Sequence, residues 1–291
     1  MAELSPVEIA LLSAALPELR GAVVNSPLYP DHRGLIEYRA VGDRGKPVVL
    51  CLHGLGSSAD GYRAQLAGLS ADFHVVAWNA PGFGASSQIE ARDVHIDDYA
   101  TALEAFLRAS KIERLAALVG SSWGSIVAVA FAARFPNLVE RLVLSAPSRA
   151  LGHLNGAQRE DELSSRLQAA DVSIEVSRAD VADRLVAPQA TAAVRRHVER
   201  LRDAMTTFGW RQAIRSLFSV SVPEIVPAVR CRINLLVGTE DRIAPYQEHA
   251  RLIQDAVPQA RLHWFDGCGH ILKLEAPEKF NAIVRAAAAP A

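Results

Sequence analysis

The sequence predicts an α/β fold with a mostly parallel sheet, interrupted by a helical insertion. Strand-like segments alternate with helical ones along most of the 291 residues, which is the pattern of a parallel sheet covered by helices. Several of the strand-like segments are continuous runs of Val, Leu and Ile, as in strands that are buried on both faces. Between residues 148 and 223 the strand signal disappears and only helical patterning remains.

The first element along the chain is expected to be a short N-terminal helix. Ser5 can cap it, Pro6 suits the first helical position, and Glu8 lies three residues after Ser5, which completes a capping box. Acidic residues at Glu3, Glu8 and Glu18 replace the basic start of a signal peptide. We therefore interpret this segment as part of the fold.

The strands and helices of the sheet region follow from composition and spacing. Strands are expected at 35–40, 47–52, 74–78, 115–119, 138–144, 232–237 and 261–265, and helices at about 96–110, 123–135, 245–256 and 277–288. Pro223 and Pro227 mark the end of the insertion. The predicted organisation is a core in two parts, 1–147 and 224–291, with a helical cap at 148–223.

The composition limits the classes of partner. Half of the residues are hydrophobic, and 31 Lys+Arg balance 32 Asp+Glu for a net charge of −1. A balanced charge provides no long-range field for a phosphate backbone, which argues against nucleic acid. No apolar run reaches the ~20 residues that span a bilayer. Cys51, Cys231 and Cys268 lack disulfide or zinc spacing, so reduced thiols and a cytoplasmic location are expected.

The strongest functional signal is the pentapeptide Gly120-Ser121-Ser122-Trp123-Gly124, a GxSxG pattern between a predicted strand and a predicted helix. A sharp strand-to-helix turn raises the side chain of its central residue above the edge of the sheet. Residues two positions away must then be small, as both glycines are. Ser122 is the predicted nucleophile; a chance match in a Gly/Ser-rich turn is the alternative.

A serine nucleophile needs a general base that is oriented by a carboxylate. For this type of turn the chain order is Ser, then Asp or Glu, then His. Asp241 and His270 follow the strands predicted at 232–237 and 261–265, at the sheet edge where α/β sheets place their sites. We predict Asp241 as the acid, with Glu240 as the competing acid, and His270 as the base.

Backbone N–H groups are expected to stabilise the oxyanion of the tetrahedral intermediate. One donor is the residue after the nucleophile, Trp123, and the other comes from the loop after an earlier strand, for which we select Leu55. We expect the side chains of both residues to line the pocket. Phe208, Trp210 and Ile271 are further candidates for contact with the substrate.

Two other types of site are disfavoured. Residues 54–59 fit the GxGxxA dinucleotide pattern, but the next strand ends at Asn79 without the acid that would bind the ribose. The histidines other than His270 share no metal-ligand spacing. We therefore expect neither a cofactor nor a metal.

The sequence resembles the α/β-hydrolase fold superfamily, through VVLCLHGLGSS at 48–58, VVAWNAPGFGASS at 75–87, LVGSSWGS at 118–125, LLVGTEDRIAP at 235–245 and FDGCGHILKLEAPEKFN at 265–281. The resemblance implies an eight-stranded, mostly parallel sheet with a helical cap over the active site. It is similar to bacterial esterases, enol-lactonases and the C–C hydrolases of aromatic degradation. Asn79, where members usually have Asp, and Ser125, where many have Gly, are departures.

The predicted function is hydrolysis of a small carboxylic ester or lactone by a Ser-Asp-His triad, without a cofactor, through an acyl-enzyme on Ser122. The expected partner is a small apolar or aromatic substrate, for a monomer or homodimer. One alternative is C–C bond hydrolysis of ring-cleavage products by the same triad, with Arg195, Arg196 or Arg211 near a substrate carboxylate. The other is a ligand-binding member of the fold without catalysis.

Overall fold

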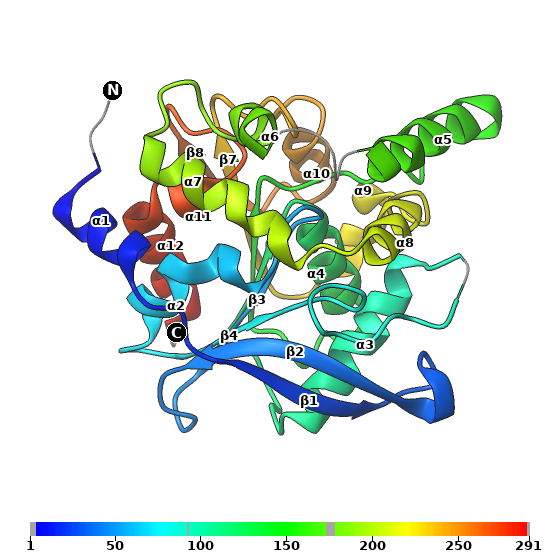
Figure 1. Ribbon diagram of the computed structural model, residues 1–291, viewed down its shortest axis with the longest axis horizontal. Coiled ribbons are helices and arrows are strands. Elements are labelled where there is room, and N and C mark those ends of the chain that lie inside the picture. The colour runs from blue at the N-terminus through cyan, green and yellow to red at the C-terminus, as the bar shows by residue number, and fades with distance from the viewer. Residues whose placement is uncertain (1–3, 92, 173–177, 290–291) are drawn as a thin grey trace.

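Eight strands form one sheet in the order β1-β2-β4-β3-β5-β6-β7-β8, in a computed structural model that describes residues 4–91, 93–172 and 178–289. From β4 to β8 the neighbouring strands are parallel, and β1 and β2 add an antiparallel edge (Figure 1). The predicted fold class is confirmed. The strands are β1 Leu19–Asn25, β2 Arg33–Val41, β3 Val48–Leu52, β4 His74–Trp78, β5 Ala117–Ser121, β6 Arg141–Ser145, β7 Arg232–Gly238 and β8 Arg261–Phe265.

Helices cover both faces of this sheet. One face packs against α3 and α4, and the other packs against α2 and α12. Because both faces are covered, the central strands are buried along nearly their whole length. The helices around the sheet are α1 Pro6–Ser13, α2 Arg63–Leu69, α3 Ile96–Ala109, α4 Trp123–Arg134, α10 Ala250–Ala256, α11 Leu272–Glu275 and α12 Pro277–Ala288.

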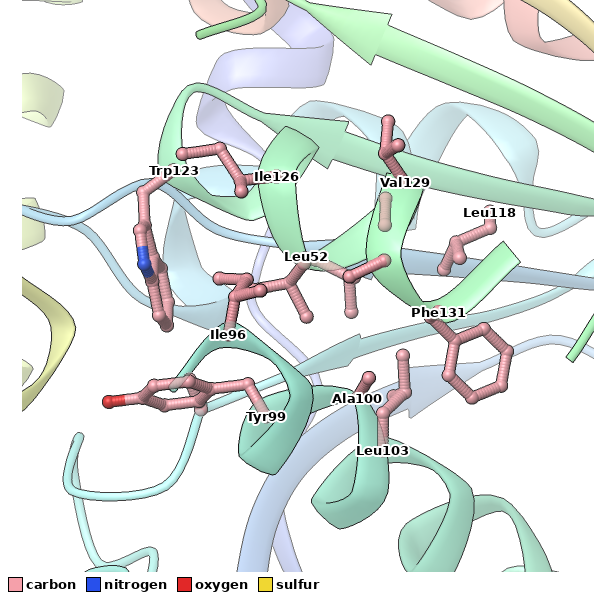
Figure 2. Packing of buried hydrophobic residues seen from close by; sticks show 14 of the residues in the cluster. Leu52, Ile96, Tyr99, Ala100, Leu103, Leu118, Trp123, Ile126, Val129 and Phe131 are labelled. Atoms are coloured by element: carbon pink, nitrogen blue, oxygen red, sulfur yellow. The ribbon is translucent and has the colours of Figure 1, made fainter. Parts of the chain in front are cut away.

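The core beneath the predicted nucleophile is dense and aromatic. Trp123 points from the start of α4 toward Tyr99 of α3 (Figure 2), with ring centroids 4.7 Å apart in an edge-to-face arrangement. Its indole N–H donates to Ser216 Oγ at 3.0 Å. This packing anchors the first turn of α4, and with it the residue that precedes the helix.

The described helices between β6 and β7 lie in the segment that was predicted as a cap. Helix α6 and helix α7 contact one another and pack on the C-terminal part of the chain, whereas α5 lies against α8 and extends outward (Figure 1). None of the described helices is both long and apolar enough to cross a membrane. The helices of this segment are α5 Gly156–Val172, α6 Arg178–Leu185, α7 Ala192–Arg200, α8 Thr207–Leu217 and α9 Val222–Ile225.

Most predicted elements are present, with differences at their ends. The capping box of Ser5 and Glu8 is confirmed, and β4 and β8 have the predicted limits. The strand expected at 115–119 lies at Ala117–Ser121, and the helix expected from residue 245 begins at Ala250. Strand β1 and helix α2 were not predicted.

Candidate active site

Ser122 occupies a strained turn between β5 and α4. Its backbone has φ 53° and ψ −118°, and it is the N-cap of α4. A positive φ in a non-glycine residue costs about 1–3 kcal/mol and persists only where its surroundings enforce it. The Ser122 N–H donates to the carbonyl of Ser145 at 2.9 Å, which holds this turn against the next strand.

The two glycines of the pentapeptide lie where no side chain fits. A Cβ on Gly120 would lie 2.4 Å from the carbonyl oxygen of Gly124, and a Cβ on Gly124 would lie 2.3 Å from that of Leu52. Both neighbours are backbone atoms and cannot move aside easily. The turn therefore depends on close backbone approach at both positions.

Ser125, the departure from the usual glycine, stabilises the same turn. Its hydroxyl donates to the carbonyl of Ser122 and accepts from the N–H of Ser148 at 3.2 Å. It thereby connects the nucleophile turn to the segment that leads from β6 into the insertion.

His270 and Asp241 form a buried pair at the carboxyl ends of β8 and β7. Nδ1 of His270 lies 2.9 Å from Oδ2 and 3.1 Å from Oδ1 of Asp241. The carboxylate also accepts from the N–H groups of Ile243 and Ala244, at 2.8 and 2.9 Å. These contacts fix the carboxylate on one side of the imidazole and leave Nε2 to face another group.

Charge keeps Asp241 ionised although it is buried. Burial raises the pKa of Asp241, but the adjacent His270 and the N–H donors of Ala244 and Ile243 outweigh it, so the pKa lies below its ordinary value. An ionised Asp241 favours the tautomer of His270 that carries its proton on Nδ1. The unprotonated Nε2 can then act as a base.

Glu275 holds the His270 turn in place, a role that the sequence did not reveal. One of its carboxylate oxygens accepts from the N–H groups of Gly269 and Ala187, and the other accepts from Ile271 at 3.0 Å. The His270 N–H donates to Leu185 of α6 at 2.7 Å. These hydrogen bonds connect the turn to α11, which follows it, and to α6 of the inserted segment.

The loop after β3 lies directly above Ser122. A Cβ on Gly54 would lie 3.2 Å from Cβ of Ser122, and the next residue, Leu55, lines the same cavity as Ser122. His53 positions this loop: its Nε2 accepts from the N–H of Ala80 at 3.0 Å. Burial lowers the pKa of His53 to about 4, so its imidazole is neutral at pH 7.

A cavity of about 340 Å³ connects these parts. Ser122 and His270 line it together with Leu55, Trp210 and Ile271. Among the described residues, no hydrogen bond joins the side chains of Ser122 and His270. Such catalytic hydrogen bonds often form fully only when substrate binds. The remaining lining residues are Gly54, Gly56, Ser57, Ser121, Arg166, Ala169, Val181, Arg184, Leu185, Leu201, Arg202, Ile243 and Lys273.

Some predicted contacts lie elsewhere. Phe208 is outside this lining, and 46 % of its surface is exposed. The side chain of Trp123 was expected in the pocket; that expectation was wrong, because the indole packs into the core and is 2 % exposed. Arg195 is held by Asp183 and by the backbone carbonyls of Ala187, Pro188 and Ala190.

The cationic side chains that line the cavity are not the predicted arginines, and they come from distant parts of the chain. Arg166 of α5, Arg184 of α6, Arg202 and Lys273 line it, and among the described lining residues none is acidic. Arg166 also pairs with Glu162 at 2.6 Å, and Arg202 stacks on Trp210. These four residues could not be selected from the sequence, because nothing in their local spacing links them.

Comparison with known proteins places the chain in a family. Residues 47–277 match the family model described as alpha/beta hydrolase fold. The chain belongs to the alpha/beta hydrolase fold family. In the part of this hydrolase that the structure describes, no group of three or more His, Cys, Asp and Glu side chains could hold a metal ion.

Similar proteins carry hydrolase names. A 2-hydroxy-6-oxononadienedioate/2-hydroxy-6-oxononatrienedioate hydrolase of Pseudomonas putida is 29 % identical over 265 residues, covering 86 % of this chain and 90 % of that protein. An esterase of Thermogutta terrifontis superposes with a TM-score of 0.79 at 20 % identity, covering 92 % of this chain and 97 % of that one. The enol-lactonase of Burkholderia xenovorans LB400 superposes with a TM-score of 0.77 at 21 % identity, covering 92 % of this chain and 99 % of that one. The two solved structures share the fold of this chain, and the Pseudomonas putida relative, which it matches over most of its length, is named as a hydrolase.

Proposed function

We propose that the chain is a serine hydrolase that cleaves a small carboxylic ester or lactone, with Ser122, Asp241 and His270 as its catalytic triad. The proposal rests on one observation: Ser122 and His270 line the same cavity. Ser122 has a strained backbone at the start of α4, and Asp241 holds Nδ1 of His270. Serine hydrolases use this arrangement of nucleophile, base and orienting carboxylate on several unrelated folds.

In the first half of the reaction, Nε2 of His270 takes the proton of Ser122 while Oγ attacks the carbonyl carbon of the substrate. The negative charge that forms on the carbonyl oxygen is stabilised by the backbone N–H groups of Trp123 and Leu55. Trp123 begins α4, whose positive dipole end faces the same point. The C–O bond then breaks, and His270 gives its proton to the leaving alkoxide.

In the second half, water replaces the alcohol. His270 removes a proton from this water, the hydroxide attacks the acyl carbon on Ser122, and the same two N–H groups stabilise the second oxyanion. Collapse of this intermediate releases the carboxylic acid and returns the proton to Ser122. The triad and the N–H groups supply the nucleophile, the base and the charge stabilisation, so the proposed reaction needs no cofactor.

A second candidate is hydrolysis of a C–C bond in a vinylogous diketone by the same residues. The specific observation in its favour is the similarity of the chain to the Pseudomonas putida hydrolase. The cations that line the cavity are compatible with the acidic groups of such substrates.

Comparison of kcat/KM over activated esters, lactones and ring-cleavage dienoates tests the proposal. We expect the highest values for an ester or a lactone, at least about tenfold above any dienoate, which corresponds to about 1.4 kcal/mol of transition-state stabilisation. A dienoate with the highest kcat/KM would instead establish the C–C hydrolase. Absence of turnover in every class by folded protein would contradict both.

A further inference from the structure

Lys273 is an unusual component of the cavity wall. It lies on α11, three residues after His270, and its side chain is buried, with the residue 1 % exposed. Its Nζ donates to Ser121 Oγ at 3.0 Å and lies 5.1 Å from the centre of the Tyr62 ring. Both of these partners are neutral.

A buried ammonium normally has a carboxylate partner, because its transfer from water is costly. The nearest carboxylate on the same helix, Glu275, already accepts three backbone N–H groups. Cys51 on β3 and His53 after it are buried, and both are neutral at pH 7: burial raises the pKa of the thiol and lowers that of the imidazole. Among the described residues, no carboxylate forms an ion pair or a hydrogen bond with Lys273; the charge of Glu275 only opposes the effect of burial on its pKa.

Burial lowers the pKa of Lys273 to about 8. Most molecules therefore carry the ammonium at pH 7, with only one of its three N–H donors used in the described structure. An anion that entered the cavity would find a cation with unused donors.

Ser57 supplies a second unused polar group at the same place. It is 5 % exposed and lines the cavity, and its hydroxyl has no partner in the part of the chain that the structure describes. Both side chains lie next to Gly61: a Cβ added to Gly61 would lie 2.6 Å from Oγ of Ser57 and 3.4 Å from Cε of Lys273. The two side chains are therefore neighbours.

These groups lie close to the nucleophile. Ser121, which accepts from Lys273, is the residue before Ser122, and Ser57 belongs to the loop above it. All of them line the cavity that contains Ser122 and His270, in which no described lining residue is acidic. A buried hydroxyl without a partner is destabilising, and a ligand atom that hydrogen-bonds to it would remove that penalty.

We infer that Lys273 and Ser57 form an anion subsite beside Ser122, and that the enzyme prefers esters or lactones that carry a free carboxylate. The inference rests on the proposed function, and it adds the charge of the substrate to it. Lys273 would pair with the carboxylate and Ser57 would donate to it. Both groups would act in substrate binding, whereas proton transfer stays with His270.

Matched pairs of esters test the inference. The first pair is 4-nitrophenyl hydrogen glutarate and its neutral methyl ester, with the carboxylate in the acyl part. The second pair is the acetate of 4-hydroxybenzoate and the acetate of methyl 4-hydroxybenzoate, with the carboxylate in the leaving group. For the wild type we expect kcat/KM to favour the anion about tenfold or more in at least one pair, mainly through KM.

Three variants assign that preference to the subsite. In Lys273→Met the ratio of anionic to neutral kcat/KM is expected to fall about tenfold or more, and in Ser57→Ala about threefold. Lys279→Met is the matched control, since Lys279 lies on α12 outside the cavity lining and donates to the Trp264 carbonyl. It should leave the ratio within about twofold of wild type.

The outcomes separate this inference from the proposed function. Turnover of the neutral esters without preference for either anion, or a preference that folded Lys273→Met retains, would overturn the subsite alone. Failure of folded protein to hydrolyse any of the four esters and any lactone would overturn the proposed function as well. If Lys273→Met does not fold, Ser57→Ala decides, because removal of an unpartnered hydroxyl leaves no broken hydrogen bond; an unchanged ratio in that variant contradicts the subsite.

Discussion

Replacement of Ser122 with alanine is expected to lower kcat for an activated ester by about 10⁵-fold, while the protein keeps its fold. The variant loses the nucleophile, and the N–H groups of Leu55 and Trp123 remain. Residual turnover should therefore still exceed the rate in water. Initial rates with 4-nitrophenyl acetate measure the effect.

Ser165→Ala is the matched control for this substitution. Ser165 is exposed on α5 and does not line the cavity, so its loss should leave kcat within about twofold of wild type. Circular dichroism and thermal unfolding of both variants would show that each is folded. Unchanged turnover in folded Ser122→Ala would remove Ser122 from the mechanism.

Replacement of Asp241 with asparagine should lower kcat by about 10⁴-fold. The amide oxygen can still accept from the N–H groups of Ile243 and Ala244, so the loop is retained. It cannot favour the Nδ1–H tautomer of His270 as a carboxylate does, and it does not stabilise the imidazolium that forms when Ser122 is deprotonated. Steady-state kinetics at pH 7 measures the loss.

Glu240→Gln makes the same chemical change at the adjacent residue. Glu240 is exposed, and its backbone N–H donates to the carbonyl of Cys268. The Asp241 carboxylate, in contrast, contacts His270. We expect kcat of Glu240→Gln within about twofold of wild type. A larger loss in Glu240→Gln than in Asp241→Asn would reverse the assignment of the acid.

The parts of the fold that sequence could predict are those with a strong local signal. The central strands are continuous apolar runs, and Ser5 and Glu8 mark the first helix by a specific hydrogen-bond pattern. Strand β1 has one fully buried position, at Val24, and a glycine within it, so its stability comes from pairing with β2. Local composition carries little of that information.

The site shows the same division between local and long-range information. Ser122, Asp241 and His270 could be selected as candidates because each lies at the end of a strand, in a pattern with a fixed chain order. Lys273 could not, because a lysine between two leucines in a short helix has no evident role until the fold places it beside Ser121. Arg166 and Arg184 meet the cavity through the packing of the inserted helices, which spacing along the chain does not encode.

Covalent labelling measures whether Ser122 is the nucleophile of a serine hydrolase. Folded protein is incubated with a small fluorophosphonate, digested, and analysed by mass spectrometry, with Ser122→Ala treated in parallel. We expect one phosphonyl group per chain on Ser122, loss of ester turnover in step with labelling, and no label on Ser122→Ala. Absence of label on active wild-type protein, or equal labelling of Ser122→Ala, would show that Ser122 is not the nucleophile.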